Sequence, residues 1–348
     1  MSIFYEIEFA KYILPYPFMI PILENKRIYW YDNLKFFLMV LVVLGHGADY
    51  GTSQYASFRF TYLFVYIFHM PLFLFISGLF FKDINIKRKI MYYIAIGFAM
   101  KILICFLHIL FGDDKLSFNL LGDSEIPWFM FVLAIFTGLT HITRFINKKF
   151  LLLFSILLAC FVGYDKNIGD FLYLSRAIVF YPFYLLGTML SKENILNFYQ
   201  AHDRLKIIYG LIVITISICL FWRFVDQLYF LRPLFTARNS FYHIKVALRW
   251  AWAFRLFYYF LVVIISLAFM SLISVKQLPY ISKWGGRTLS VFFWHSCVLQ
   301  VLHHYGFFTL LYGNKVGRGS LIFLAIIILL LLYYYYSFKP RLFWFLFR

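Results

Sequence analysis

Two ionisable side chains near the start of a long apolar run have a spacing that suits joint chemistry. Lys35 is followed by ten mostly apolar residues and then by His46. Because eleven residues make about three helical turns, both side chains lie on one helix face, roughly 16 Å apart along the axis. An imidazole accepts protons near neutral pH, and an ammonium group binds phosphate as a point charge. The pair therefore predicts a histidine base or acyl carrier at one depth and an anion-binding cation at another.

Three further ionisable side chains lie inside apolar runs downstream. His69 comes two residues before Pro71, Arg176 opens a later run, and His295 follows Phe292-Phe293-Trp294. Burying such a group in a bilayer costs about 2.5–3.5 kcal/mol on insertion scales, so each is a candidate for a substrate-binding site.

Each candidate also has a purely structural interpretation, and the sequence leaves both open. Lys35 is placed to extend its ammonium group to the interface, and His46 stands near a helix end. Pro71 is expected to kink its helix, and His69 is placed to satisfy the backbone group that this proline frees. Arg176 is an interface anchor or a cation facing a cavity, and His295 is a packing partner or a catalytic group.

Two carboxylates stand one helical turn from the first pair. Asp32 precedes Lys35 by three residues and is placed to hold its ammonium group. Asp49 follows His46 by three residues and either orients its ring or marks the helix end. No cluster of His, Cys or Asp has metal-ligand spacing, so we expect no metal.

The amino-acid composition indicates that these groups lie in a membrane protein. Of the 348 residues, 63% are apolar and 14% are charged, and the mean hydropathy is +0.79. Soluble domains are nearer half apolar and a quarter charged, which excludes a soluble enzyme. The formal net charge of +18 is what the positive-inside rule produces in membrane proteins, so we expect a lipid bilayer and no nucleic acid as partner.

Runs of about the length that crosses a bilayer predict an all-α polytopic membrane protein with about ten transmembrane helices. We expect residues 1–30 to form a cytoplasmic or interfacial arm and residues 31–348 to form a single membrane domain. The predicted spans are 33–51, 61–81, 89–111, 128–146, 149–163, 171–190, 205–222, 256–275, 288–305 and 320–337.

The distribution of basic residues among the loops predicts which side of the membrane each loop and terminus occupies. They precede the first span and follow the even-numbered spans, which places both termini in the cytoplasm and the protein in the cytoplasmic (inner) membrane. The segment 223–255 would be external, yet it carries six Lys or Arg residues. Two arrangements are open for it: it lies against the membrane surface, or it lines a cavity.

The opening motif resembles a known family. Tyr31-Asp32-Asn33-Leu34-Lys35, followed by His46, is similar to the start of the acyltransferase-3 family, closest to its branch of fucose 4-O-acetylases and capsular polysaccharide O-acetyltransferases. Lysine stands where that family usually carries arginine, which keeps the charge but loses the bidentate fork. The later blocks that follow the family order are Phe68 to Phe73 with Ser77-Gly78, Trp128-Phe129, Arg176 with Pro182-Phe183 and Gly187, and Gly285 to His295.

The resemblance implies ten spans and transfer of an acyl group, usually acetyl. The donor would be cytoplasmic acetyl-CoA or another acyl-CoA, used as a substrate with no bound cofactor. The acceptor would be a hydroxyl of a cell-envelope glycan or its lipid-linked precursor. We assign His46 and Lys35 as catalytic, and Asp32, His69, Arg176 and His295 to substrate binding. The alternative is a polysaccharide exporter or flippase without transferase activity, since buried ionisable residues also mark transport paths.

Overall fold

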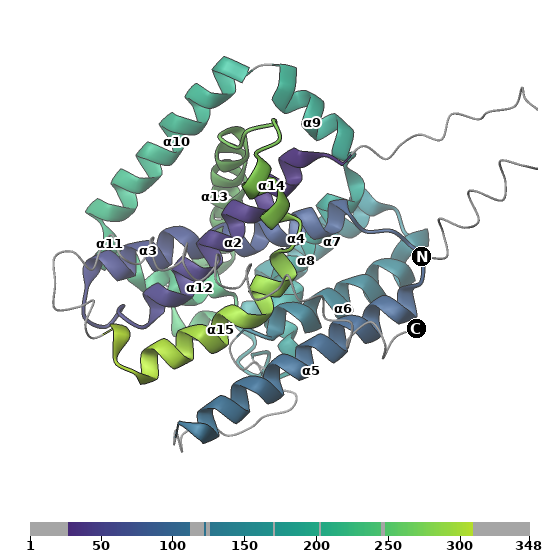
Figure 1. Ribbon diagram of the computed structural model, residues 1–348. Helices are drawn as coiled ribbons and strands as arrows, with labels where there is room; N and C mark the ends of the chain where they lie inside the picture. The colour runs from purple at the N-terminus through teal and green to yellow at the C-terminus, as the bar shows by residue number, and fades with distance from the viewer. Residues whose placement is uncertain are drawn as a thin grey trace, which may run out of the picture.

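The computed structural model describes residues 27–111, 122, 126–169, 171–201, 203–244 and 248–308, and all regular secondary structure in these ranges is helical. Figure 1 shows α2 near the middle of the helices, with α9 and α10 arching along one edge. The principal helices are α2 (Tyr29–Asp49), α3 (Ala56–Tyr66), α4 (His69–Leu79), α5 (Ile86–Leu110), α6 (Trp128–Ile142), α7 (Lys148–Phe161), α8 (Leu174–Met189), α9 (Lys192–Ala201), α10 (Asp203–Arg223), α13 (Ala251–Ser271), α14 (Pro279–Gly285) and α15 (Thr288–His304).

Six helical segments within the described ranges are long and apolar enough to cross a membrane. They are Ala56–Leu79, Ile86–Leu110, Trp128–Phe145, Phe171–Met189, Arg204–Arg223 and Leu248–Ser271. The predicted spans 33–51, 149–163 and 288–305 coincide with α2, α7 and α15, which are helical but shorter or more polar. The predicted span 320–337 and most of the predicted arm lie outside the described residues, and Tyr29 and Trp30 already belong to α2.

The outer helices carry apolar side chains on their exposed faces. Only 17% of the span in α10 is buried, and Leu211, Ile212 and Ile216 are exposed on it. Helix α5 is similar, with Ile102 and Phe106 exposed. Exposing such apolar surfaces to water would cost free energy, whereas contact with lipid hydrocarbon would not. This is expected of a multi-pass membrane protein.

The predicted kink at Pro71 is present. Helix α3 ends at Tyr66 and α4 begins at His69, so the span Ala56–Leu79 is interrupted by a short turn. Proline has no N–H and its ring clashes with the carbonyl of the residue four before it, which is Ile67. The break falls at that residue, and His69, which begins α4 directly after it, is buried.

Helices α4 and α8 lie in backbone contact because glycines face each other. A Cβ atom on Gly78 would lie 2.0 Å from the carbonyl oxygen of Tyr184, and one on Gly187 would lie 2.1 Å from that of Phe75. These small residues therefore allow the close packing of α4 against α8. The contact fixes α4, which carries His69, against α8, which carries Arg176.

Candidate functional site

Two cavities lie along α2, one toward each end of the helix. The larger, about 720 Å³, is lined by His46, His69 and Arg176 among others. The smaller, about 330 Å³, is lined by Lys35 and Lys89 and otherwise mainly by apolar and aromatic residues. Val42, Met70 and Phe292 belong to the walls of both cavities. The face of α2 that carries Lys35 and His46 therefore borders two cavities with a shared partition.

His46 lies beside the aromatic face of α3. Gly45 allows this contact, because a Cβ atom there would already be 3.0 Å from the Tyr66 ring. The Tyr66 hydroxyl and His46 Nδ1 are 3.2 Å apart, at hydrogen-bond distance. The expected partner of His46 was Asp49, and this expectation is wrong: the Asp49 carboxylate accepts a hydrogen bond from Arg232 Nη2 at 2.7 Å. Asp49 also lines the large cavity.

His69 bonds to a backbone carbonyl and also borders the large cavity, although that carbonyl is the one of Val65 and not the Ile67 carbonyl freed by Pro71. Its Nδ1 atom is 2.7 Å from the carbonyl oxygen of Val65, in the last turn before the Pro71 break. Since a carbonyl only accepts, Nδ1 donates, and in the neutral ring Nε2 carries the lone pair. The same side chain lines the large cavity. It therefore satisfies a backbone group and adds a second imidazole to the site.

His295 lies behind His46 and is fully buried, with 0% of its surface exposed. The two rings have centroids 5.3 Å apart. His295 Nδ1 donates to the carbonyl oxygen of Phe292 at 2.8 Å, and Nε2 has no hydrogen-bond partner within the described part of the chain. His295 is thus a neighbour of the site histidine, held by its own helix.

Arg176 enters the large cavity from the first turn of α8. Its guanidinium group stacks over the Trp128 ring at 4.4 Å, and its Nε donates to the carbonyl oxygen of Thr236 at 3.2 Å. A planar guanidinium on an aromatic face is held firmly, because cation–π attraction strengthens when water is excluded. Of the two interpretations of Arg176, the cation facing a cavity is the one found.

The basic segment 223–255 also reaches this cavity. Its residues 232–239, which we call the strap, begin with α12 (Arg232–Thr236) and turn at Ala237, whose φ is 54°. Strap residues that line the large cavity are Arg232, Pro233, Phe235, Thr236, Arg238 and Asn239. Of the two arrangements open for this segment, the cavity lining is confirmed.

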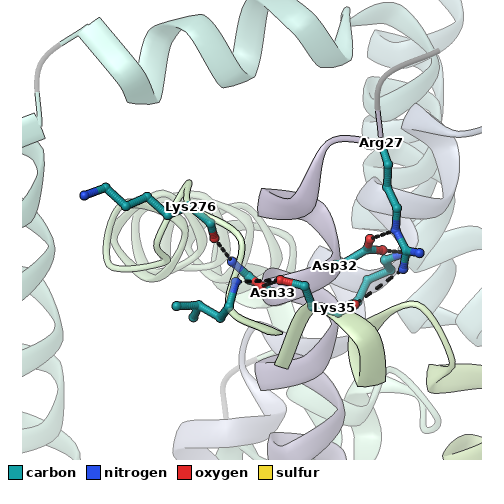
Figure 2. Close-up of polar contacts among 7 residues, drawn as sticks. Arg27, Asp32, Asn33, Lys35 and Lys276 are labelled. Atoms are coloured by element: carbon teal, nitrogen blue, oxygen red, sulfur yellow. Dashed lines mark hydrogen bonds and ion pairs between the residues drawn. The ribbon is translucent and has the colours of Figure 1, made fainter. Parts of the chain in front are cut away.

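The first turns of α2 hold a second polar cluster (Figure 2). The Asp32 carboxylate forms ion pairs with Lys35 at 2.9 Å and with Arg27 at 2.6 Å. The expected Asp32–Lys35 contact is therefore present. Asp32 itself is buried and belongs to the lining of neither cavity. Its contribution to the small cavity is to hold the Lys35 side chain, which lines that cavity, in place.

Asn33 points to the other side of α2 and fastens the segment before α14 (Figure 2). Its Nδ2 donates to the carbonyl oxygens of Ser274 and Lys276, and its Oδ1 accepts from the Ser282 hydroxyl at 2.6 Å. Gly285 completes the contact, because a Cβ atom there would lie 1.7 Å from the Asp32 carbonyl oxygen. The motif 31–35 is thus a docking motif for α14 as well as the source of Lys35.

Ammonium groups gather at the small cavity near Phe80 and Phe81, which line it. Lys35 and Lys192 lie 5.7 and 4.8 Å from the centroid of the Phe80 ring, and Lys89 lies 5.8 Å from that of Phe81. Phe80 is 44% exposed, so this part of the cavity reaches the surface. The arrangement suits a ligand with a highly charged head and an apolar extension.

The structure divides the predicted residues into two groups. His46, His69 and Arg176 border the large cavity with His295 behind them, and Lys35 with Asp32 stands at the small one. Sequence reasoning missed Tyr66 and Lys89, which nothing distinguished from many similar residues. The signal for Arg232 and Arg238 was the charge of 223–255, which broke the loop pattern. The described residues contain no group of three or more His, Cys, Asp or Glu placed to hold a metal ion.

Comparisons with curated proteins and with solved structures give no match. Comparison with protein families gives one, described as an acyltransferase domain, over residues 28–337. This range includes both cavities and all six predicted site residues. The chain therefore belongs to the acyltransferase-3 family, and it is a multi-pass membrane acyltransferase.

Proposed function

We propose that this acyltransferase moves an acyl group, most simply acetyl, from acyl-CoA to a hydroxyl of a cell-envelope polysaccharide or its lipid-linked precursor. The observation that carries the proposal is the pair of cavities on one face of α2, with lysines at one and imidazoles at the other. Acyl-CoA suits the small cavity, because its phosphates would meet the lysines and its long arm, which joins the phosphates to the thioester, would lie along the apolar lining.

The acyl-CoA donor binds in the small cavity. Lys35, Lys89 and Lys192 hold the phosphates near Phe80 and Phe81, and the apolar lining takes the arm. The thioester then reaches the partition formed by Val42, Met70 and Phe292, beyond which His46 stands. Because these three side chains border both cavities, their movement opens the path. We place the small cavity on the cytoplasmic side of the inner membrane, where acyl-CoA is made.

His46 activates the acceptor in the large cavity. The Tyr66 hydroxyl oxygen accepts a hydrogen bond from the Nδ1–H of His46, which leaves the lone pair of Nε2 free to take the proton of the acceptor hydroxyl. The hydroxyl oxygen attacks the thioester carbonyl carbon, a C–O bond forms and the C–S bond breaks. The CoA thiolate leaves and takes the proton back from the imidazolium. In a covalent alternative, His46 Nε2 first takes the acyl group from CoA, and the acceptor hydroxyl then takes it from the acyl-histidine.

The test is His46→Ala in the full-length protein. We expect ester formation on the glycan to fall by about 10²–10⁴, the usual contribution of a general base, with a normal amount of protein in the membrane. His46→Gln, which forms hydrogen bonds but does not titrate, should be equally inactive. NMR of the isolated glycan measures the ester, and immunoblotting of membranes measures the protein.

His108→Ala is the matched control, since His108 lies on α5 and lines neither cavity. It should keep near-normal acylation. Near-normal acylation in His46→Ala would remove His46 from the chemistry. Loss of the glycan itself from the cell surface, with its ester intact inside, would favour the exporter alternative.

A further inference from the structure

His295 carries a buried ring nitrogen that the proposed reaction leaves unused. The side chain has 0% of its surface exposed and lines neither the small nor the large cavity. Its ring centroid lies 5.3 Å from that of His46, which does line the large cavity. His295 therefore acts on the reaction through its neighbours, and the neighbour that carries the chemistry is His46.

The helix that carries His295 determines which of its ring nitrogens holds the hydrogen. Nδ1 lies 2.8 Å from the carbonyl oxygen of Phe292 and 3.2 Å from that of Val291, one turn earlier in α15. A carbonyl oxygen only accepts, so Nδ1 carries the hydrogen and donates it. An isolated charge buried in this way would be costly, so the ring is neutral and its Nε2 carries a lone pair.

This lone pair is unsatisfied in the structure. Nε2 of His295 is buried and has no hydrogen-bond partner among the residues that the structure describes. A buried acceptor left unpaired costs about 1–3 kcal/mol, so such a group calls for an explanation. Because Nδ1 is turned to the carbonyl oxygens of α15, Nε2 is turned away from that backbone, and the ring of His46 on α2 is next to it.

His46 becomes a cation during the proposed reaction, and the cation has a use for the lone pair. When His46 Nε2 takes the hydroxyl proton, its ring becomes an imidazolium whose Nδ1–H donates to Tyr66. The N-acyl ring of the covalent route is a cation as well. A fixed dipole with its negative end beside a developing positive charge stabilises that charge most where water is excluded. An interaction that is stronger after proton transfer lowers the barrier without tightening substrate binding.

We propose that His295 is a positioning residue for His46, and that its unsatisfied Nε2 lone pair stabilises the positive charge that His46 acquires during acyl transfer. His295 itself takes no proton, and the proton on His46 still goes to the CoA thiolate. The proposal rests on the proposed function and deepens it. This role differs from the substrate contact expected for His295 from the sequence.

The experiment compares His295→Gln with His295→Phe in the full-length protein in lipid nanodiscs. The donor is acetyl-CoA, the acceptor is the de-esterified envelope polysaccharide, and the released CoA thiol gives the rate. Glutamine offers an oxygen acceptor in place of Nε2, whereas phenylalanine fills the space and offers none. We expect kcat to fall at least about tenfold in His295→Phe, the rate equivalent of one lost acceptor, and less than about threefold in His295→Gln. The KM of the polysaccharide should stay unchanged in both variants.

A role of His295 in packing alone predicts the opposite order of the two variants. Phenylalanine resembles the imidazole ring in shape, whereas glutamine buries an amide, so packing would make His295→Gln the less active and less stable protein. All rates are divided by the amount of folded protein, which size-exclusion chromatography measures. Val298→Ala is the control for the packing of α15, because Val298 packs against the core from the same helix and lines neither cavity. It should keep the kcat of the wild type.

Equal kcat values for His295→Phe and the wild type would overturn the proposal, and so would a higher kcat in His295→Phe than in His295→Gln. A raised KM of the polysaccharide with an unchanged kcat would make His295 a substrate contact, which also contradicts it. The two proposals fail differently. Without the proposed function the wild type itself forms no ester from acetyl-CoA, whereas without this inference the wild type and His295→Phe form it at the same rate.

Discussion

The polar side chains of α2 are held by different kinds of contact at the two ends of the helix. At the start, Asp32 has two ion pairs, and they fix Lys35 at the small cavity. Farther along, His46 has a tyrosine hydroxyl beside it and a second imidazole behind it. A fixed cation suits binding, and a neutral ring with an uncharged partner suits proton transfer. The two ends of one helix face are therefore prepared for different tasks.

Lys35→Ala should impair the use of the acyl donor far more than that of the acceptor. Removing a charged contact of 1.5–3 kcal/mol raises the donor KM roughly ten- to a hundredfold. Asp32 keeps Arg27 as its ion-pair partner, so the fold should survive. Steady-state kinetics with each substrate varied in turn checks the prediction.

Lys35→Arg keeps the charge and should stay near wild type, and Lys149→Ala removes an exposed lysine from the α7 N-terminus as a control. If Lys35→Ala reduced the use of both substrates equally, Lys35 would not be a donor-binding residue.

At the scale of helices, close backbone contacts decide which side chains meet. The α4–α8 contact at Gly78 and Gly187 brings His69 and Arg176 to one cavity, and Gly285 brings α14 against α2. His69 begins α4 directly after the break from α3 and is buried. These elements are apolar enough to be stable in lipid in many arrangements, and the glycines select one of them.

Gly78→Ala should therefore destabilise the protein and lower its activity together. The added Cβ atom would lie 2.0 Å from the Tyr184 carbonyl oxygen, so α4 and α8 must separate. Overpacking of this kind costs about 1–3 kcal/mol, and the separation also displaces His69 from Arg176. Thermal unfolding in detergent and acyl transfer are measured side by side.

Gly138→Ala is the matched control, since the nearest atom to its new Cβ is a flexible Ile90 side-chain carbon at 3.4 Å. It should unfold at the wild-type temperature. Equal melting temperatures for the two variants would mean that the α4–α8 contact is not tight in the membrane.

At the scale of the whole molecule, the basic loops meet at one end of the helices. Lys148 Nζ donates to the carbonyl oxygen of Thr188, and Tyr31 and Asn33 donate to those of Lys192 and Lys276. The small cavity with its lysines lies at this same end. The strap and Asp49 lie at the other. The strap end also carries basic residues, Arg232 and Arg238, so the cytoplasmic placement of the small-cavity end stays a prediction from the charges of the short loops.

Reporter fusions test the topology. Fusions after residues 85, 148 and 348 should all report the cytoplasm, because basic residues surround these positions. A fusion after residue 239, in the strap, should report the outside. A cytoplasmic signal at 239 or an external signal at 85 would invert the predicted arrangement and move the donor cavity to the wrong side.

Local sequence patterns were enough to predict the class of the protein and most helix positions. Apolar runs and Pro71 gave the helices and the break, since bilayer burial depends on local composition and proline acts on its own backbone. Charge in apolar runs singled out Lys35, His46 and Arg176, because such groups are costly wherever they lie. These are properties of neighbouring residues along the chain.

Which side chains meet across the fold could not be predicted from the sequence. Tyr66 lies beside His46, and Arg232 takes Asp49 away from it, through contacts between segments 20 and 183 residues apart. In a chain of which 24% is aromatic, a single tyrosine carries no signal. The strap turns inward because Arg255, Tyr258, Arg176 and Ser175 satisfy its backbone carbonyls, and hydrogen bonds of that kind depend on distances in space, which sequence spacing does not give.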